Sequence, residues 1–128
     1  YPGKFAIVVA LSSNGTSSDF QLAEKEGKPL YQVVMEKMMS ISTPENMMFV
    51  VGATKADKLA EIRQFCPDNF FLVPGVGAQG GSAEEVIANG SNSKGGLLIN
   101  SSRGIIYASS GEDFAEAAAK SAENTARI

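Results

Sequence analysis

The stretch 70–86 reads FFLVPGVGAQGGSAEEV and contains an apolar run, a glycine-rich loop and the start of a helix. The apolar run at residues 70–73 shows no alternation of polar and apolar positions, which is typical of a strand buried on both faces of a parallel sheet. Ser82 stands three residues before Glu85, a spacing that predicts a helix whose first turn is capped by the serine. The stretch therefore predicts a strand, a loop and a helix in immediate succession.

The same pattern recurs along the chain. Further apolar runs occupy residues 5–11, 47–51 and 96–99, and segments with helical periodicity follow each run, the last at residues 114–126. Two weaker capping pairs, Thr54 with Asp57 and Ser110 with Asp113, mark other helix starts. Alternating strands and helices predict an α/β fold with a parallel sheet, a single domain over residues 1–128 made of four βα units. A small open sheet and half of an eight-stranded barrel both satisfy this pattern.

Composition restricts the class of protein. The chain of 128 residues is 44% hydrophobic and 20% charged, which is typical of a globular domain. A net charge of -3 without a basic run argues against nucleic acid or an anionic membrane as a partner, and no apolar stretch approaches the ~20 residues of a membrane span. The one cysteine, Cys66, is predicted to be a small core residue in a cytoplasmic protein. Because the chain has no histidine, we expect no zinc site and no Ser/His/Asp or Cys/His catalytic set.

The loops that follow the strands carry the candidate binding residues. In a parallel sheet these loops share the carboxyl edge, where such folds bind ligands. Glycines surround Gln79 in the loop 74–81, so that backbone N–H groups and the following helix dipole can face an anion. Arg103, in the loop after the last strand, offers a guanidinium suited to bidentate phosphate binding. The two loops together predict a phosphate-monoester site, although a tight turn and a surface arginine remain the simpler interpretations.

Other residues in and near these loops could indicate different chemistry. Gly75-x-Gly77-x-x-Gly80 matches the dinucleotide fingerprint, but the stretch 98–102 lacks the carboxylate that would bind the ribose, so we do not expect a nicotinamide cofactor. Asp19 and Lys55 are the other charged residues near the predicted edge, and both are expected to be solvated rather than catalytic.

The polar run 12–14, Ser-Ser-Asn, follows the first strand and suits hydrogen bonding to a planar polar ring, or merely caps the strand end.

Three runs, FVVGAT at 49–54, LVPGVGAQGG at 72–81 and NSSRGI at 100–105, resemble orotidine 5'-phosphate decarboxylase, in particular the longer-chain class of that enzyme. The resemblance covers nearly the whole chain but only the carboxyl-terminal half of the family's barrel. It implies strands 5 to 8 of a (β/α)8 TIM barrel.

The resemblance also implies roles for individual residues. It implies that the substrate phosphate is held by Gln79 and Arg103, with backbone N–H groups near Gly77 and Ser102 assisting. It implies that the pyrimidine ring is lined by Pro74 and contacted by Ser13, with Ser12 and Asn14 as neighbours.

The family reaction is the cofactor-free decarboxylation of orotidine monophosphate to UMP in pyrimidine biosynthesis. Its catalytic Lys/Asp array includes an Asp-x-Lys-x-x-Asp motif, which these 128 residues do not contain. The resemblance therefore implies that this chain holds part of the substrate and is inactive alone, and that it pairs with the missing half or with a copy of itself. The alternatives are a phosphate-binding α/β module without catalysis, and a barrel isomerase or aldolase, which would need a base or Schiff-base lysine at a strand end.

Overall fold

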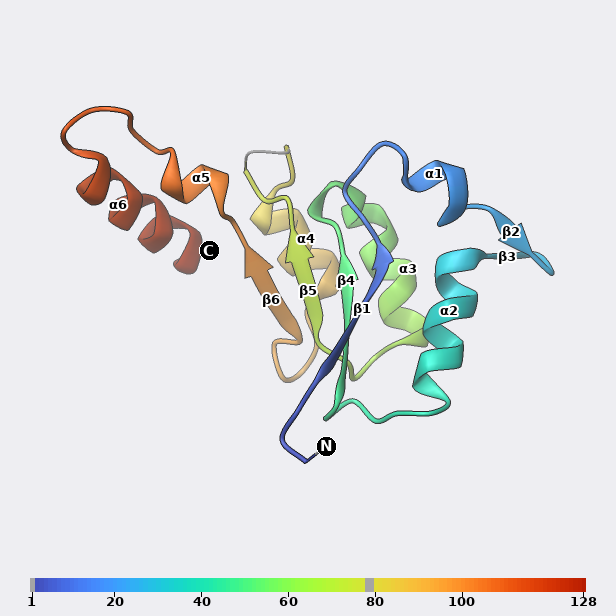
Figure 1. Ribbon diagram of the computed structural model, residues 1–128. Coiled ribbons are helices and arrows are strands. Elements are labelled where there is room, and N and C mark those ends of the chain that lie inside the picture. The colour runs from blue at the N-terminus through green and yellow to red at the C-terminus, as the bar shows by residue number, and fades with distance from the viewer. Residues whose placement is uncertain (1, 78–79) are drawn as a thin grey trace.

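A parallel sheet of four strands forms the centre of the computed structural model, which describes residues 2–77 and 80–128. The strands are β1 (Ala6–Leu11), β4 (Met47–Val51), β5 (Phe71–Pro74) and β6 (Leu97–Asn100), and they pair in the order β1-β4-β5-β6 (Figure 1). Each lies within one residue of a predicted strand. The four predicted βα units are therefore confirmed.

The helices that follow the strands are α2 (Leu30–Met39), α3 (Ala56–Phe65), α4 (Ala83–Gly90) and α6 (Phe114–Ala126), with a 3-10 turn η1 (Ala53–Lys55) before α3. Short elements that the sequence did not predict lie in the connections: α1 (Ser17–Phe20), the antiparallel ribbon β2 (Glu24–Lys25) with β3 (Lys28–Pro29), and α5 (Arg103–Ile106). None of the helices in the described part of the chain is long and apolar enough to cross a membrane.

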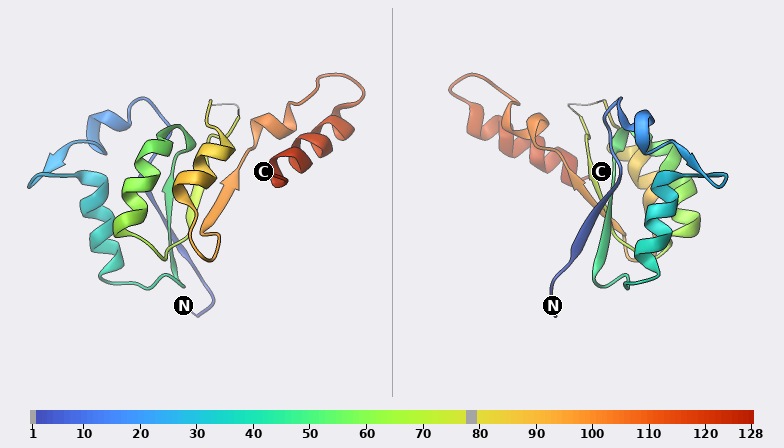
Figure 2. Two further views of the ribbon diagram at one scale, coloured as in Figure 1. Left: turned by 180° about the vertical axis from the view of Figure 1, so that it is seen from behind. Right: turned by 45° about the vertical axis from the view of Figure 1, so that its right-hand side comes forward.

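The topology distinguishes the two architectures that the sequence left open. The strands follow one another across the sheet in chain order without a reversal. Helices α2, α3 and α4 all cover the same face of the sheet, as the views in Figure 2 show. A doubly wound sheet reverses its strand order and carries helices on both faces, whereas a barrel does neither. The fold is therefore half of a (β/α)8 barrel.

The hydrophobic core fills the space between the sheet and these helices. Cys66 is fully buried there, as predicted. Side chains with no exposed surface come from β1, β4 and β5 on one side and from α2, α3 and α4 on the other, among them Leu11, Phe49, Phe71, Met35, Leu59 and Val86.

The opposite face of the sheet is uncovered, so the prediction of strands buried on both faces is wrong for this chain. Apolar side chains on β1 and β6 are exposed there, with Val9 61% and Leu98 52% exposed. Strand register places one apolar residue from each strand in a row across this face: Val9, Val50, Leu72 and Leu98. The uninterrupted apolar runs reflect this row, which none of the residues 2–77 and 80–128 covers.

Only one of the three predicted helix caps forms. The Ser82 hydroxyl accepts a hydrogen bond from the Glu85 N–H at 3.2 Å and caps α4. Thr54 lies inside η1 and makes no capping bond. Ser110 also makes none, because α6 begins after Asp113, whose carboxylate instead accepts from Ser109. The two predicted caps fail for different reasons: the Thr54 hydroxyl donates to the Ser13 carbonyl instead, and Asp113 takes part in a local turn bond with Ser109.

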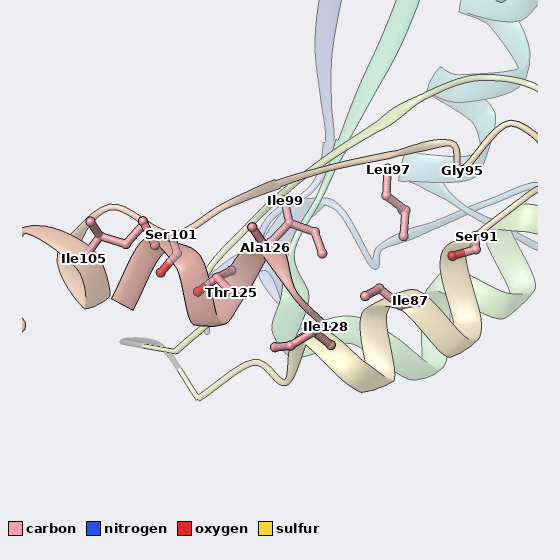
Figure 3. Close-up of a pocket in the computed structure, with 11 residues that line it drawn as sticks. Ile87, Ser91, Gly95, Leu97, Ile99, Ser101, Ile105, Thr125, Ala126 and Ile128 are labelled. Carbon is pink, nitrogen blue, oxygen red and sulfur yellow. The ribbon is translucent and has the colours of Figure 1, made fainter. Parts of the chain in front are cut away.

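Helix α6 stands apart from the other helices and contacts α5 at the end of the sheet (Figure 1). A groove of about 460 Å³ lies between α4, β6 and α6. Figure 3 shows Ile87 of α4 and Leu97 and Ile99 of β6 opposite Thr125 and Ala126 of α6. The groove is mostly apolar and lies on the helix side of β6.

Candidate functional site

The loops that follow β1, β4, β5 and β6 meet at the carboxyl edge of the sheet, the upper edge in Figure 1. Contacts join each loop to its neighbour, from β1 through β4 and β5 to β6. We call these four joined loops the rim. The rim carries every described residue that the sequence singled out for binding.

The loop after β5 is a glycine turn. Gly75, Gly77 and Gly80 have positive φ angles of 96°, 76° and 85°, a backbone conformation that residues with a side chain rarely adopt. Gly81 donates to the carbonyl of Gly75 at 3.2 Å, and a side chain at Gly81 would collide with Ala53 of the β4 loop. This close packing explains why the loop holds more glycines than a turn requires.

The predicted phosphate ligand Gln79 lies outside the described residues, as does Ala78. Gly77 is exposed, but its N–H donates to the carbonyl of Gly81 at 3.0 Å. That bond closes the glycine turn and occupies the Gly77 amide in this structure. A phosphate contact through Gly77 itself would have to replace this bond.

The loop after β1 rests on the loop after β5. The Ser13 hydroxyl donates to the carbonyl of Pro74 at 3.2 Å, so the structure brings these two predicted residues together. Ser12 donates its backbone N–H to the Gln21 side chain at 2.8 Å, which ties the loop to α1. The side chain of Asn14 is exposed. The Ser13 hydroxyl uses its single hydrogen for the bond to Pro74, so its oxygen remains available to accept a hydrogen bond.

The loop after β4 supports Ser13 from the other side through Gly52 and Thr54, two residues for which we predicted no role in the site. The Thr54 hydroxyl donates to the carbonyl of Ser13 at 3.2 Å. Gly52 packs so closely that a side chain on it would collide with the backbone and hydroxyl of Ser13. The signal for both was their position directly after a strand, next to the other rim loops.

The loop after β6 completes the rim. The Ser101 hydroxyl donates to the carbonyl of Val76 at 3.3 Å and holds this loop against the glycine turn. Ser102 and Arg103 follow at the start of α5, and both are exposed. The predicted residues on the β5 and β6 loops therefore lie on adjacent, hydrogen-bonded segments.

The described part of the rim offers cations, hydroxyls and a glycine turn. Within residues 2–77 and 80–128, no carboxylate lies within 4.0 Å of the Arg103 guanidinium, so its charge is available to an anion. Asp19 is exposed on α1, and Lys55 is half-buried at the end of η1. These groups can hold and orient a polar anionic molecule.

The fold and the rim define the chain as half of a (β/α)8 barrel with its candidate site at the carboxyl edge of the strands. No protein-family model matches it. Among curated proteins it is 54% identical over 123 residues to the orotidine 5'-phosphate decarboxylase of Christiangramia forsetii, covering 96% of this chain and 45% of that protein. The namesake from Flavobacterium johnsoniae is 51% identical, with 95% of this chain and 45% of that protein covered.

Solved structures lead to the same family. Leishmania donovani UMP synthase superposes with a TM-score of 0.83 at 36% identity, over all of this chain and 28% of that one. Leishmania donovani OMP decarboxylase superposes with a TM-score of 0.79 at 32% identity, over 99% of this chain and 48% of that one. The chain is thus a homologue of orotidine 5'-phosphate decarboxylase over nearly its own length, and it spans about half the length of the curated relatives it matches.

Proposed function

We propose that this chain forms the carboxyl-terminal half of an orotidine 5'-phosphate decarboxylase and holds the phosphate and part of the pyrimidine of orotidine 5'-phosphate. The observation that carries the proposal is identity of 54% over 96% of the chain, combined with a rim that joins the predicted binding loops. The enzyme would release CO2 from the pyrimidine and leave UMP.

Two residues of the rim loops are proposed to bind the phosphate. Arg103 presents an exposed guanidinium on the loop that Ser101 holds against the glycine turn. Gln79 belongs to that turn by sequence and is proposed as the second phosphate ligand. Contacts to a remote phosphate supply binding energy that the enzyme can use in the transition state.

The catalytic lysine and aspartates would come from the other half of the barrel. The sequence holds no Asp-x-Lys-x-x-Asp motif, and the charged residues predicted near this edge are Asp19, Lys55 and Arg103. We therefore propose that the chain alone does not decarboxylate orotidine 5'-phosphate.

The uncovered sheet face gives the other half a place to bind. In the described chain, strands β1 and β6 each have one free edge, and the apolar row across the sheet is exposed at its ends, Val9 and Leu98, and half-buried at Val50 and Leu72. Four further parallel strands would pair with both edges and close an eight-stranded barrel over this row. We propose that the occupant of this face is the amino-terminal half of the same enzyme.

The test is complementation with a half-barrel from a relative. The chain is mixed with the first half of the Christiangramia forsetii protein, and CO2 release from orotidine 5'-phosphate is measured. We expect turnover from the mixture and none from either half. Arg103→Ala should reduce kcat/KM by at least ~100-fold, since it removes a charge-assisted bidentate contact, whereas Arg127→Ala, an exposed arginine on the last turn, should have little effect.

Two results would contradict the proposal. Turnover by the chain alone would show that it contains a catalytic group that the sequence does not reveal. A complemented barrel that turns over equally well with Arg103→Ala would remove Arg103 from the phosphate site.

A further inference from the structure

We propose that Thr54 is a positioning residue for the pyrimidine side of the substrate site. Its hydroxyl fixes the loop after β1, so that Ser13 stays in place against the loop after β5. The inference rests on the proposed function, because it concerns how the same site recognises its substrate.

Ser13 is tied from both sides by its neighbours. The Thr54 hydroxyl donates to the Ser13 carbonyl at 3.2 Å, and the Ser13 hydroxyl donates to the Pro74 carbonyl at 3.2 Å. The three residues come from the loops after β4, β1 and β5. Thr54 thereby links Ser13, which is proposed to face the pyrimidine base, to Pro74, which is proposed to line the base.

Close packing restricts Ser13 further. Gly52 donates its N–H to the carbonyl of Leu11 at 2.7 Å, which brings the β4 loop against the end of β1. A side chain at Gly52 would collide with Ser13. Ser13 therefore cannot move toward β4, and the Thr54 bond prevents it from moving away.

The Thr54 hydroxyl has no other structural task in the described chain. Although its spacing to Asp57 suggested a helix cap, it makes no capping bond to α3. Its residue is exposed, so removal of the hydroxyl leaves the core intact. Loss of the Thr54 hydroxyl should consequently change ligand affinity rather than the stability of the fold.

The experiment compares two ligands that differ in the base. Affinities for UMP and for ribose 5-phosphate are measured by calorimetry on the barrel formed by the chain and the other half. Thr54→Val replaces the hydroxyl by a methyl group of similar size, and Thr54→Ser keeps it.

We expect Thr54→Val to weaken UMP binding by about 5- to 10-fold, the loss of one orienting hydrogen bond, with ribose 5-phosphate binding changed by less than ~2-fold. Thr54→Ser should retain UMP affinity. Thr54→Ala, which lacks the hydroxyl and adds no methyl, should repeat the selective loss and replaces Thr54→Val if that variant does not fold.

Equal weakening of both ligands would show a general structural role and overturn the inference. Unchanged UMP affinity in Thr54→Val and Thr54→Ala would overturn it as well. If the unsubstituted barrel binds ribose 5-phosphate but not UMP, the proposed function fails, and this inference fails with it.

Discussion

At the scale of single residues, Arg63 does the most to join separate elements. It lies on α3, half-buried, and its guanidinium carbon lies 3.8 Å from the centre of the Phe71 ring. Burial lowers the pKa of this guanidinium, which remains charged because its ordinary pKa is so high. Its N–H groups donate to five backbone carbonyls at the amino edge of the sheet, those of Cys66, Pro67, Asn69, Gly90 and Gly96.

We predict that Arg63→Met lowers the free energy of unfolding by about 2–4 kcal/mol, because it leaves several half-buried carbonyls without a donor. Arg63→Lys should lose less, since an ammonium group supplies three donors. Arg127→Met is the matched control: its exposed ion pair with Glu123 spans 3.6 Å and should contribute within ~0.5 kcal/mol. Urea unfolding measures all three, and equal losses at Arg63 and Arg127 would refute the role.

Cys66 lies beside this cluster, and its burial predicts a pH dependence. Burial raises the pKa of the Cys66 thiol to about 11, above the ordinary value of 9.0, while the charge of Arg63 acts in the other direction. Its Sγ donates to the Asn69 side chain at 3.4 Å. The folded state therefore favours the neutral thiol.

Because the folded pKa exceeds the unfolded one, the contribution of the thiol to stability is complete below pH ~9 and is lost as the pH rises toward 11. At pH 8 the thiolate fraction should be on the order of 100-fold lower than in the unfolded chain. Labelling with a thiol reagent, with and without urea, measures this. Fast labelling of the folded chain would contradict the prediction, and Cys66→Ala should remove this part of the alkaline loss of stability.

At the scale of elements, the start of α4 depends on a local bond. Ser82 caps the helix by accepting from Glu85, and its hydroxyl donates to the Glu84 carboxylate at 2.8 Å. The helix follows the glycine turn directly, so its cap also fixes where the β5 loop ends. The cap joins helix stability to the geometry of the rim.

We predict that Ser82→Ala lowers the free energy of unfolding by about 1 kcal/mol, the usual cost of losing a serine cap. Ser110→Ala is the control, because Ser110 precedes α6 without capping it, and its change should stay within ~0.5 kcal/mol. Thermal unfolding compares the two variants. A larger loss at Ser110 than at Ser82 would show that the capping bond does not stabilise α4.

At the scale of the whole molecule, helices α2, α3 and α4 cover one face of the sheet, and no helix of the described residues covers the other (Figure 2). The row of apolar side chains on the bare face lies where the interior of a closed barrel would be. Apolar surface of this kind associates with another surface or with itself. This face is therefore the surface at which we propose that the other half of the barrel binds.

We predict that Val9→Lys weakens association with the other half of the barrel by at least ~100-fold, because it buries an unpaired charge. Phe20→Lys is the control: Phe20 is 75% exposed on α1, away from the sheet face, and should change association by less than ~2-fold. Calorimetric titration of one half with the other measures both. Normal association of Val9→Lys would show that this face is not the interface.

Sequence alone determined the four βα units and their order. The uninterrupted apolar runs at residues 47–51 and 70–73 became β4 and β5, because they are too short for a stable helix and are rich in aromatic and β-branched residues. Ser82 was correctly predicted to cap α4, because a capping bond between residues three apart in the chain depends only on local backbone geometry. Short elements such as α5 escaped prediction because four residues show no period.

Tertiary structure decided what the elements do together. It selected the half-barrel over an open sheet by placing the helices on one face, and it left Val9 and Leu98 exposed where the sequence predicted burial. It also brought the Thr54 hydroxyl to the Ser13 carbonyl, so that Thr54 holds a neighbouring loop and does not cap a helix. These outcomes depend on which loops come together at the edge of the sheet, and contacts between residues far apart in the chain leave no local pattern in the sequence.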